Sequence, residues 1–368
     1  MTASVQIAFD TWATAQRNAT KPLAEQSIKV YASMWGAWSG WLARNNLKWH
    51  TVRPDEIERF LNGPSPTVAN RRKALNPSTM SNYHRQRYWR VLRGVYAQAV
   101  REGWIAENPV IELKESDRPR IAAKSRISQI LPPGVLALLQ DPEVLRRILP
   151  QEEEHDWAPL RDRAIIAIIA HVGLTTAEIT RLRGQDIRVG GLPLVTLVRG
   201  QQMRLDNSEA LPYVVDVANA KGDVWRSLPL PESAITSILP WIAKRQQLLG
   251  ERAATRGELH DRSQYLKQTL FPSRKSLPAP GMIKPIQPAS LYYQVDLAFE
   301  RLYKLPAARG MNKHAQGVKI AQGAAIIRNT VIRHWLDTVG VQETVMRSGL
   351  KRALSLRLAP NAKIEVTK

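Results

Sequence analysis

The sequence predicts two domains, an all-α N-terminal domain followed by a larger α+β domain. In the first hundred residues, apolar side chains recur at steps of three and four, which is typical of amphipathic helices. A polar, basic stretch at residues 114–120 then interrupts the apolar pattern, and the remaining residues mix helical periodicity with short runs typical of strands. We therefore place the two domains at residues 1–113 and 128–368, joined by a linker at residues 114–127.

At least three helices are predicted in the first domain. The helix at residues 27–45 has a largely aromatic apolar face, made of Ile28, Tyr31, Met34, Trp35, Trp38, Trp41 and Leu42. A proline followed by acidic residues predicts a short helix at residues 54–61. A third helix begins near Ser78 or Ser81 as N-cap and ends at Gly103. The helical spacing of the tryptophans favours a role in the core over one in stacking bases.

The second domain mixes both kinds of element. Its apolar pattern predicts two helices within residues 161–183, separated at Gly173. Further segments have the patterns of strands or helices, and one segment is rich in proline, serine and charge. We expect strands at residues 192–198, 213–217 and 225–230, helices at 234–249, 291–302 and 324–339, and an irregular insertion at 252–288.

Composition excludes several kinds of chemistry. The 368 residues include no cysteine, which excludes disulfides, thiol nucleophiles and cysteine-based zinc sites. No motif indicates a metal or another cofactor, so we expect none. The longest apolar run, near residues 164–170, is far shorter than the roughly 20 residues that a membrane span needs. We therefore expect a soluble cytoplasmic protein.

The charge of the chain indicates a polyanionic partner. Lysine and arginine number 53 against 32 acidic residues, which gives a formal net charge of +21. The corresponding pI is about 10.4. Such a field favours nucleic acid, although an acidic membrane surface or ribosomal RNA would also satisfy it.

Several short stretches, in a fixed order, carry a resemblance to a known family. The C-terminal half contains residues 161–166 (RDRAII), 173–179 (GLTTAEI), 221–231 (KGDVWRSLPLP) and 325–330 (AIIRNT). Together with the helical N-terminal pattern ending near residues 107–109 (ENP), they resemble the tyrosine recombinase (phage integrase) family. The resemblance implies a SAM-like core-binding domain and a tyrosine-recombinase-like catalytic-fold domain that clamp double-stranded DNA.

The resemblance fails at most of the residues that the family uses for cleavage. Thr175 stands in the slot of the first catalytic arginine, Ala325 in that of a histidine, and Leu350 in that of a second histidine or tryptophan. Lys221 and Arg328 match the family's lysine and second arginine. No tyrosine occurs between residues 351 and 368, where the nucleophile is expected. We therefore expect no catalytic residue in this chain and interpret it as a pseudoenzyme.

Four arginines on the predicted helix that ends at Gly103 are candidates for DNA contact, with a solvated helix face as the alternative: Arg85, Arg87, Arg90 and Arg93. Lys221 and Arg328 are further candidates. Lys221 is otherwise a solvated surface lysine, and Arg328 is otherwise a partner for an acidic side chain. For Glu178 we favour a structural partner, and for His334 a satisfied helix histidine.

Three functions remain open at this point. The first is a non-catalytic protein that binds duplex DNA in the nucleoid, at a specific site, as an accessory factor of recombination or a repressor of a mobile element. The second is an active recombinase or integrase with a relocated nucleophile at Tyr292, Tyr293 or Tyr303, which we otherwise interpret as core or interface aromatics. The third is a structural protein of nucleoprotein assemblies. The expected partners are duplex DNA and either an active recombinase or further copies of the chain.

Overall fold

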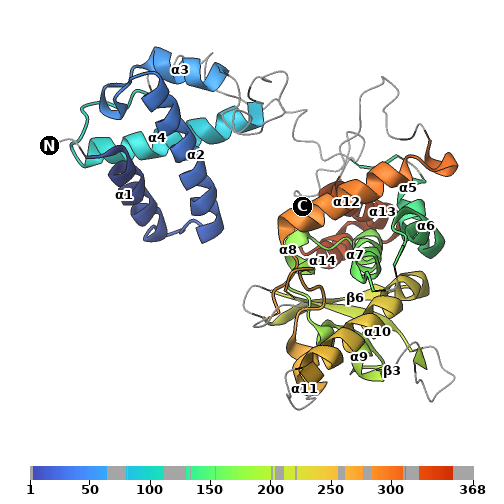
Figure 1. Ribbon diagram of the computed structural model, residues 1–368. Coiled ribbons are helices and arrows are strands. Elements are labelled where there is room, and N and C mark those ends of the chain that lie inside the picture. Colours follow the sequence, from blue (N-terminus) through green and yellow to red (C-terminus); the bar gives the residue numbers. More distant parts are fainter. Residues whose placement is uncertain are drawn as a thin grey trace. The chain divides into compact units, whose positions relative to one another are not determined.

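The computed structural model divides into two compact units, Met1–Arg126 and Ile127–Lys368 (Figure 1). The structure describes residues 3–63, 80, 82–111, 130–132, 134–153, 155–199, 202–203, 211–219, 222–255, 262–276, 283–309, 311 and 323–350. The expected linker at residues 114–127, the candidate N-caps Ser78 and Ser81, and Lys221 lie outside the described residues.

The first unit is helical wherever the structure describes regular secondary structure, as predicted. Its elements are α1 (Val5–Arg17), α2 (Glu25–Arg44), the 3-10 turn η1 (Trp49–Thr51), α3 (Pro54–Asn62) and α4 (Asn82–Arg101). The predicted helices correspond to α2, α3 and α4, whereas α1 was not predicted. Pro54 lies in the first turn of α3, where its missing N–H costs nothing.

Aromatic side chains hold the first unit together. Trp35 and Trp38 are almost completely buried, so the prediction that they belong to the core is confirmed. The indole of Trp35 donates a hydrogen bond to the carbonyl of Val5 at 2.8 Å, and that of Trp49 donates to Ala3 at 3.0 Å. These two bonds attach the beginning of α1 to the core. Buried indole N–H groups need such acceptors.

The second unit contains a small antiparallel sheet. Its order is β2-β1-β5-β6, formed by β1 (Ile187–Val189), β2 (Leu192–Pro193), β5 (Tyr213–Ala218) and β6 (Val224–Leu230). A separate pair consists of β3 (Val198–Arg199) and β4 (Gln202–Met203). Strand β5 pairs with β6 so that Val217 faces Arg226, and the register shifts immediately after Val217. The strands predicted at residues 213–217 and 225–230 are confirmed.

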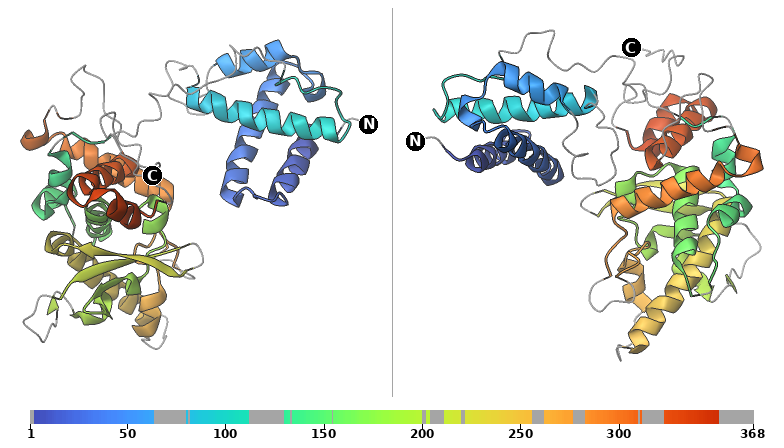
Figure 2. Two further views of the ribbon diagram at one scale, coloured as in Figure 1. Left: turned by 180° about the vertical axis from the view of Figure 1, so that it is seen from behind. Right: turned by 45° about the horizontal axis from the view of Figure 1, so that its top comes forward.

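Helices pack beside this sheet and supply most of the core of the second unit. They are α5 (Val135–Gln140), α6 (Pro142–Ile148), α7 (Ala158–Val172), α8 (Thr176–Ile179), α9 (Leu194–Leu197), α10 (Glu232–Thr255), α11 (Arg262–Lys267), α12 (Pro288–Leu302), α13 (Ala324–Thr338) and α14 (Gly340–Ser348), with 3-10 turns η3 (Gly184–Asp186) and η4 (Pro306–Ala308). The largely buried helix α7 packs against α10, α13 and β6 (Figures 1 and 2).

Two predictions for the second unit were wrong in part. Residues 192–198 do not form one strand, because α9 separates β2 from β3. Pro193 precedes that turn, and its carbonyl accepts a hydrogen bond from the Thr196 hydroxyl at 2.7 Å. The expected irregular insertion at residues 252–288 contains α11. Arg245 stabilises the end of α11 by donating to the carbonyls of Tyr265 and Thr269.

No helix within the described ranges is long and apolar enough to cross a bilayer.

Candidate functional site

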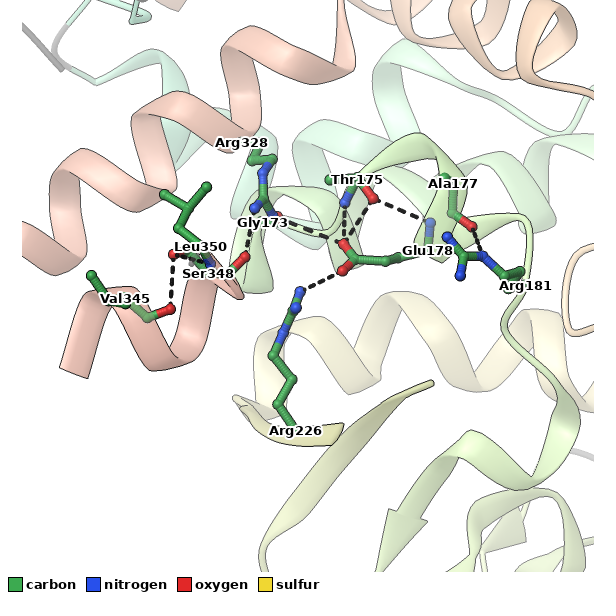
Figure 3. Close-up of polar contacts among 10 residues, drawn as sticks. All are labelled: Gly173, Thr175, Ala177, Glu178, Arg181, Arg226, Arg328, Val345, Ser348 and Leu350. Carbon is green, nitrogen blue, oxygen red and sulfur yellow. Dashed lines mark hydrogen bonds and ion pairs between the residues drawn. The ribbon is translucent and has the colours of Figure 1, made fainter. Parts of the chain in front are cut away.

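Glu178 is the centre of a group of polar contacts at the start of α8 (Figure 3). Gly173 ends α7 in the left-handed conformation, with φ at 56°, and the chain then turns into α8. Thr175 is the N-cap of α8, and its hydroxyl accepts a hydrogen bond from the Glu178 N–H at 3.2 Å. In return, Glu178 Oε2 accepts from the Thr175 N–H at 2.7 Å and from its hydroxyl at 2.9 Å. This reciprocal capping box fixes the Glu178 side chain.

Arg226 reaches Glu178 from the sheet. Its Nη2 lies 2.8 Å from Glu178 Oε1, and the two side chains are only 7% and 10% exposed. The guanidinium also lies over the ring of Trp225, 4.5 Å from the ring centroid. Burial lowers the pKa of Arg226 below its usual value, and the nearby Glu178 carboxylate opposes that shift.

Arg328 approaches the same carboxylate from α13. Its Nη1 donates to the carbonyl of Gly173 and lies 3.9 Å from Glu178 Oε2. Its Nη2 donates to the carbonyl of Ser348, at the end of α14, at 2.6 Å. Burial lowers the pKa of Arg328; Glu178 raises it and Arg226 lowers it further. Arg328 therefore connects the ends of α7 and α14 to α13.

We call Thr175, Glu178, Arg226 and Arg328 the Glu178 cluster. It places two guanidinium groups, on side chains that are 7% and 13% exposed, beside one carboxylate. Guanidinium groups suit the binding of phosphate, so the cluster has the chemistry to hold a phosphodiester. None of its four members is a tyrosine or a histidine, and it therefore contains neither the family's nucleophile nor an imidazole acid.

The positions that depart from the family have ordinary structural surroundings. Thr175 is a helix cap. Ala325 is exposed in the first turn of α13. Leu350 is half-buried and packs against the small apolar cluster of Val331, Ile332 and Trp335. Residues 351–368 lie outside the described residues, so the tyrosine-free segment is known only as sequence.

The three tyrosines considered as alternative nucleophiles are not held at the Glu178 cluster. Tyr292 and Tyr293 are 48% and 64% exposed on α12, so they are not core aromatics. Their alternative interpretation as interface aromatics stays a prediction. The ring of Tyr303 stacks on Phe299 at 5.9 Å, and burial raises the pKa of its hydroxyl. Within the described part of the chain, no polar contact joins these tyrosines to Glu178 or to the two arginines.

The four candidate arginines of the first unit all lie on α4 and differ in exposure. Arg90 and Arg93 are exposed, and the Arg93 guanidinium lies 4.9 Å from the centroid of the Trp89 ring. Arg85 and Arg87 are half-buried, and Arg85 donates to the Asn82 side chain at 3.3 Å. Arg90 and Arg93 are thus the two candidates most accessible to a ligand. Contact with DNA stays a prediction for all four.

Part of the cluster was predictable from the sequence. Glu178 as a structural partner is confirmed by its capping box and its two arginines, and Arg328 has the acidic neighbour proposed as its alternative role. The contact between Arg226 and Glu178 was missed. The only available signal was the place of Arg226 in the hairpin motif, five residues after Lys221.

Comparison with known proteins gives one local sequence relative. No family model matches the chain. The tyrosine recombinase XerC of Methylobacterium sp. (strain 4-46) is 30% identical over 105 residues, which cover 28% of this chain and 30% of that protein. The matched part thus spans less than a third of the relative's length.

Solved structures share the fold over nearly the whole chain. The XerH site-specific recombinase bound to palindromic difH substrate has a TM-score of 0.53 at 17% identity, covering 96% of this chain and 80% of that one. A lambda integrase dimer bound to a COC' core site has a TM-score of 0.50 at 12% identity, with coverages of 96% and 77%. The chain therefore shares the fold of these recombinase and integrase structures, and part of its sequence is similar to that of a tyrosine recombinase.

Proposed function

We propose that the chain binds duplex DNA without cleaving it, at a specific site, as an accessory factor of recombination or a repressor of a mobile element. The observation that carries the proposal is the Glu178 cluster. Its phosphate-binding chemistry remains in two arginines, while Thr175, in the slot of the first catalytic arginine, serves as a helix cap. Such a protein would act at the nucleoid, together with an active recombinase or with further copies of itself.

Charge and exposure support binding to duplex DNA. The chain has a formal net charge of +21, and Arg90 and Arg93 are exposed on one side of α4. Neutralising phosphates releases condensed counterions, which is the main source of affinity for most such proteins. The XerH and lambda integrase structures of the same fold were obtained with bound DNA, and we infer the same class of ligand for this chain.

The composition of the cluster supports the absence of cleavage. Strand transfer in this family needs a tyrosine oxygen as nucleophile and cationic groups at the non-bridging oxygens. Loss of one preorganised donor costs roughly 10²–10³ in rate, by analogy with other enzymes. Loss of the nucleophile prevents a covalent intermediate altogether, and the sequence has no tyrosine after Tyr303.

One observation keeps an active recombinase as the second candidate. Tyr292 and Tyr293 have exposed side chains, and their helix, α12, packs against α8, which begins at the Glu178 cluster. If a rearranged active site used either tyrosine as nucleophile, that tyrosine would therefore come from α12, a helix that neighbours the cluster.

Salt titration of duplex binding tests the proposed DNA-binding function. If the two units together neutralise about 6–10 phosphates, the affinity should fall about 10³–10⁵-fold between roughly 50 and 200 mM salt. Binding of a duplex and of a single strand of equal length should be compared over the same range. A flat salt response, or a preference for the single strand, would exclude a duplex clamp.

A further inference from the structure

Arg226 has donor groups that the described protein does not use. Its Nη2 lies 2.8 Å from Glu178 Oε1, yet Nε and Nη1 donate no hydrogen bond to any described residue. Both atoms are shielded from solvent, and the side chain as a whole is only 7% exposed. Buried polar groups in folded proteins are nearly always hydrogen-bonded, so the two free donors need an explanation.

The positive charges of the Glu178 cluster also outnumber its negative charges. Arg226 and Arg328 bring two positive charges to the single carboxylate of Glu178. The remaining contacts of Arg328 are to the neutral carbonyls of Gly173 and Ser348. A buried charge without a counter-charge is costly, because the protein interior solvates ions poorly. The cluster therefore has an excess of one positive charge, which one monoanion would balance.

The end of α14 lies beside Nη1, one of the two free donors. Gly349 is its C-cap, with φ at 68°, a conformation that favours glycine. A Cβ at this position would overlap the ring of Trp225 and Nη1 of Arg226. Residue 349 therefore lies against the Trp225 ring and the end of the Arg226 side chain, and a side chain there would force both to shift. An anion that reaches Nη1 from this side displaces this segment.

We propose that Arg226 is a phosphate-binding residue, which supplies from β6 the guanidinium that Thr175 lacks. Together with Arg328 it holds one backbone phosphate of duplex DNA, while residues 348–350 move aside. The identity of the natural ligand rests on the proposed DNA-binding function. A phosphodiester carries one negative charge, which matches the excess charge of the cluster. Guanidinium groups also form stronger hydrogen bonds with charged oxygens than with carbonyls.

Inorganic phosphate is the probe for the first test. The thermal unfolding midpoint of the full chain is measured against phosphate concentration, with chloride replacing phosphate at constant ionic strength. Phosphate also stabilises proteins by exclusion from their surface, so the informative quantity is the difference between variants. Arg226→Gln removes the proposed ligand. Arg188→Gln is the matched control, because Arg188 lies in β1 of the same sheet and has its own carboxylate, Asp216, at 2.8 Å.

We expect the unfolding midpoint to rise saturably with phosphate in the wild type and in Arg188→Gln. In Arg226→Gln we expect only the shallow, unsaturable rise that exclusion of phosphate from the protein surface produces. Glu178→Gln raises the excess charge of the cluster to two. The unfolding midpoint of this variant should therefore saturate at a several-fold lower phosphate concentration. Equal responses of wild type and Arg226→Gln would overturn the proposal, even if Arg226→Gln is less stable throughout.

Duplex DNA gives the second readout and separates the two proposals. Arg226→Gln should reduce the slope of log affinity against log salt by about 0.9, as expected for one lost phosphate contact. An unchanged slope, with salt-dependent binding intact, would refute the role of Arg226 and leave the proposed function standing. Salt-independent or absent duplex binding would refute the proposed function, whereas the phosphate response reports on Arg226 alone.

Discussion

Thr175 has a structural role at the position that the family resemblance assigns to a catalytic arginine. Its hydroxyl accepts from the N–H of Glu178 and donates to the carboxylate of the same residue. An N-cap of this kind typically contributes about 0.5–2 kcal/mol to stability. The carboxylate, which the capping box fixes, then faces Arg226 and Arg328. A threonine at this position thus stabilises the unliganded protein.

Restoring the family residue at this position should not restore activity. Thr175→Arg removes the cap and adds a third guanidinium beside Glu178, so the free energy of unfolding should fall by about 0.5–2 kcal/mol. No covalent adduct with DNA should form, because groups that act as a unit contribute non-additively. Denaturant unfolding measures the change in the free energy of unfolding, and an adduct assay detects any covalent protein–DNA product. Thr175→Ser, which keeps the capping oxygen, is the control and should stay close to wild type in stability.

At the same scale, the sequence predicted some residues of the cluster and missed others. Local spacing was enough for Glu178, because its partner Thr175 is three residues away. The bond from Arg328 to the Ser348 carbonyl joins residues 20 apart and depends on how α14 folds back on α13. Arg226 is brought to Glu178 by the pairing of β5 with β6, which composition and periodicity do not specify.

Single elements of the second unit depend on buried polar groups as well as on apolar packing. The 3-10 turn η3 is fixed by Asp186, whose Oδ2 accepts from the Arg183 N–H at 2.8 Å. Burial raises the pKa of Asp186 from 3.8 to about 6, although the bond from Arg183 opposes the shift. The folded state therefore binds a proton at Asp186 more tightly than the unfolded chain does.

This shift predicts a pH dependence of stability. Between about pH 4 and pH 6 the folded protein holds the Asp186 proton and the unfolded chain has lost it. The contribution of Asp186 to the free energy of unfolding should therefore decrease as the pH rises through this window. Asp186→Asn keeps an acceptor oxygen for Arg183 and cannot titrate. The difference in stability between wild type and Asp186→Asn, followed by denaturant unfolding, should change across this window; a constant difference would contradict the shifted pKa.

Element prediction succeeded where one face of a helix or strand is strongly apolar, as in α2 and α4. It missed α1, whose buried residues include two alanines and whose start is fixed by the indoles of Trp35 and Trp49. Those contacts are tertiary and have no local signature. It also assigned residues 192–198 to one strand, because an apolar run of that length does not separate a strand from a short buried helix.

At the scale of the whole molecule, binding governed by net charge and binding governed by local contacts predict different effects of arginine substitutions on DNA affinity. Arg90→Gln and Arg93→Gln should each weaken binding to different duplex sequences alike and reduce the salt slope by about 1, because contacts to phosphates carry little sequence information. Arg17→Gln removes the same charge from α1 of the same unit, where Arg17 pairs with Glu25 at 2.6 Å. If all three variants lose affinity equally, net charge governs binding and α4 has no special role.

A nicked suicide substrate tests most directly whether this chain binds duplex DNA and forms no covalent bond with it. The substrate traps a protein–DNA adduct if any tyrosine attacks a phosphodiester, and the adduct survives denaturant. We expect retained binding and no adduct from the wild type, even after long incubation. An adduct that disappears in Tyr292→Phe, Tyr293→Phe or Tyr303→Phe would contradict this expectation and identify a relocated nucleophile.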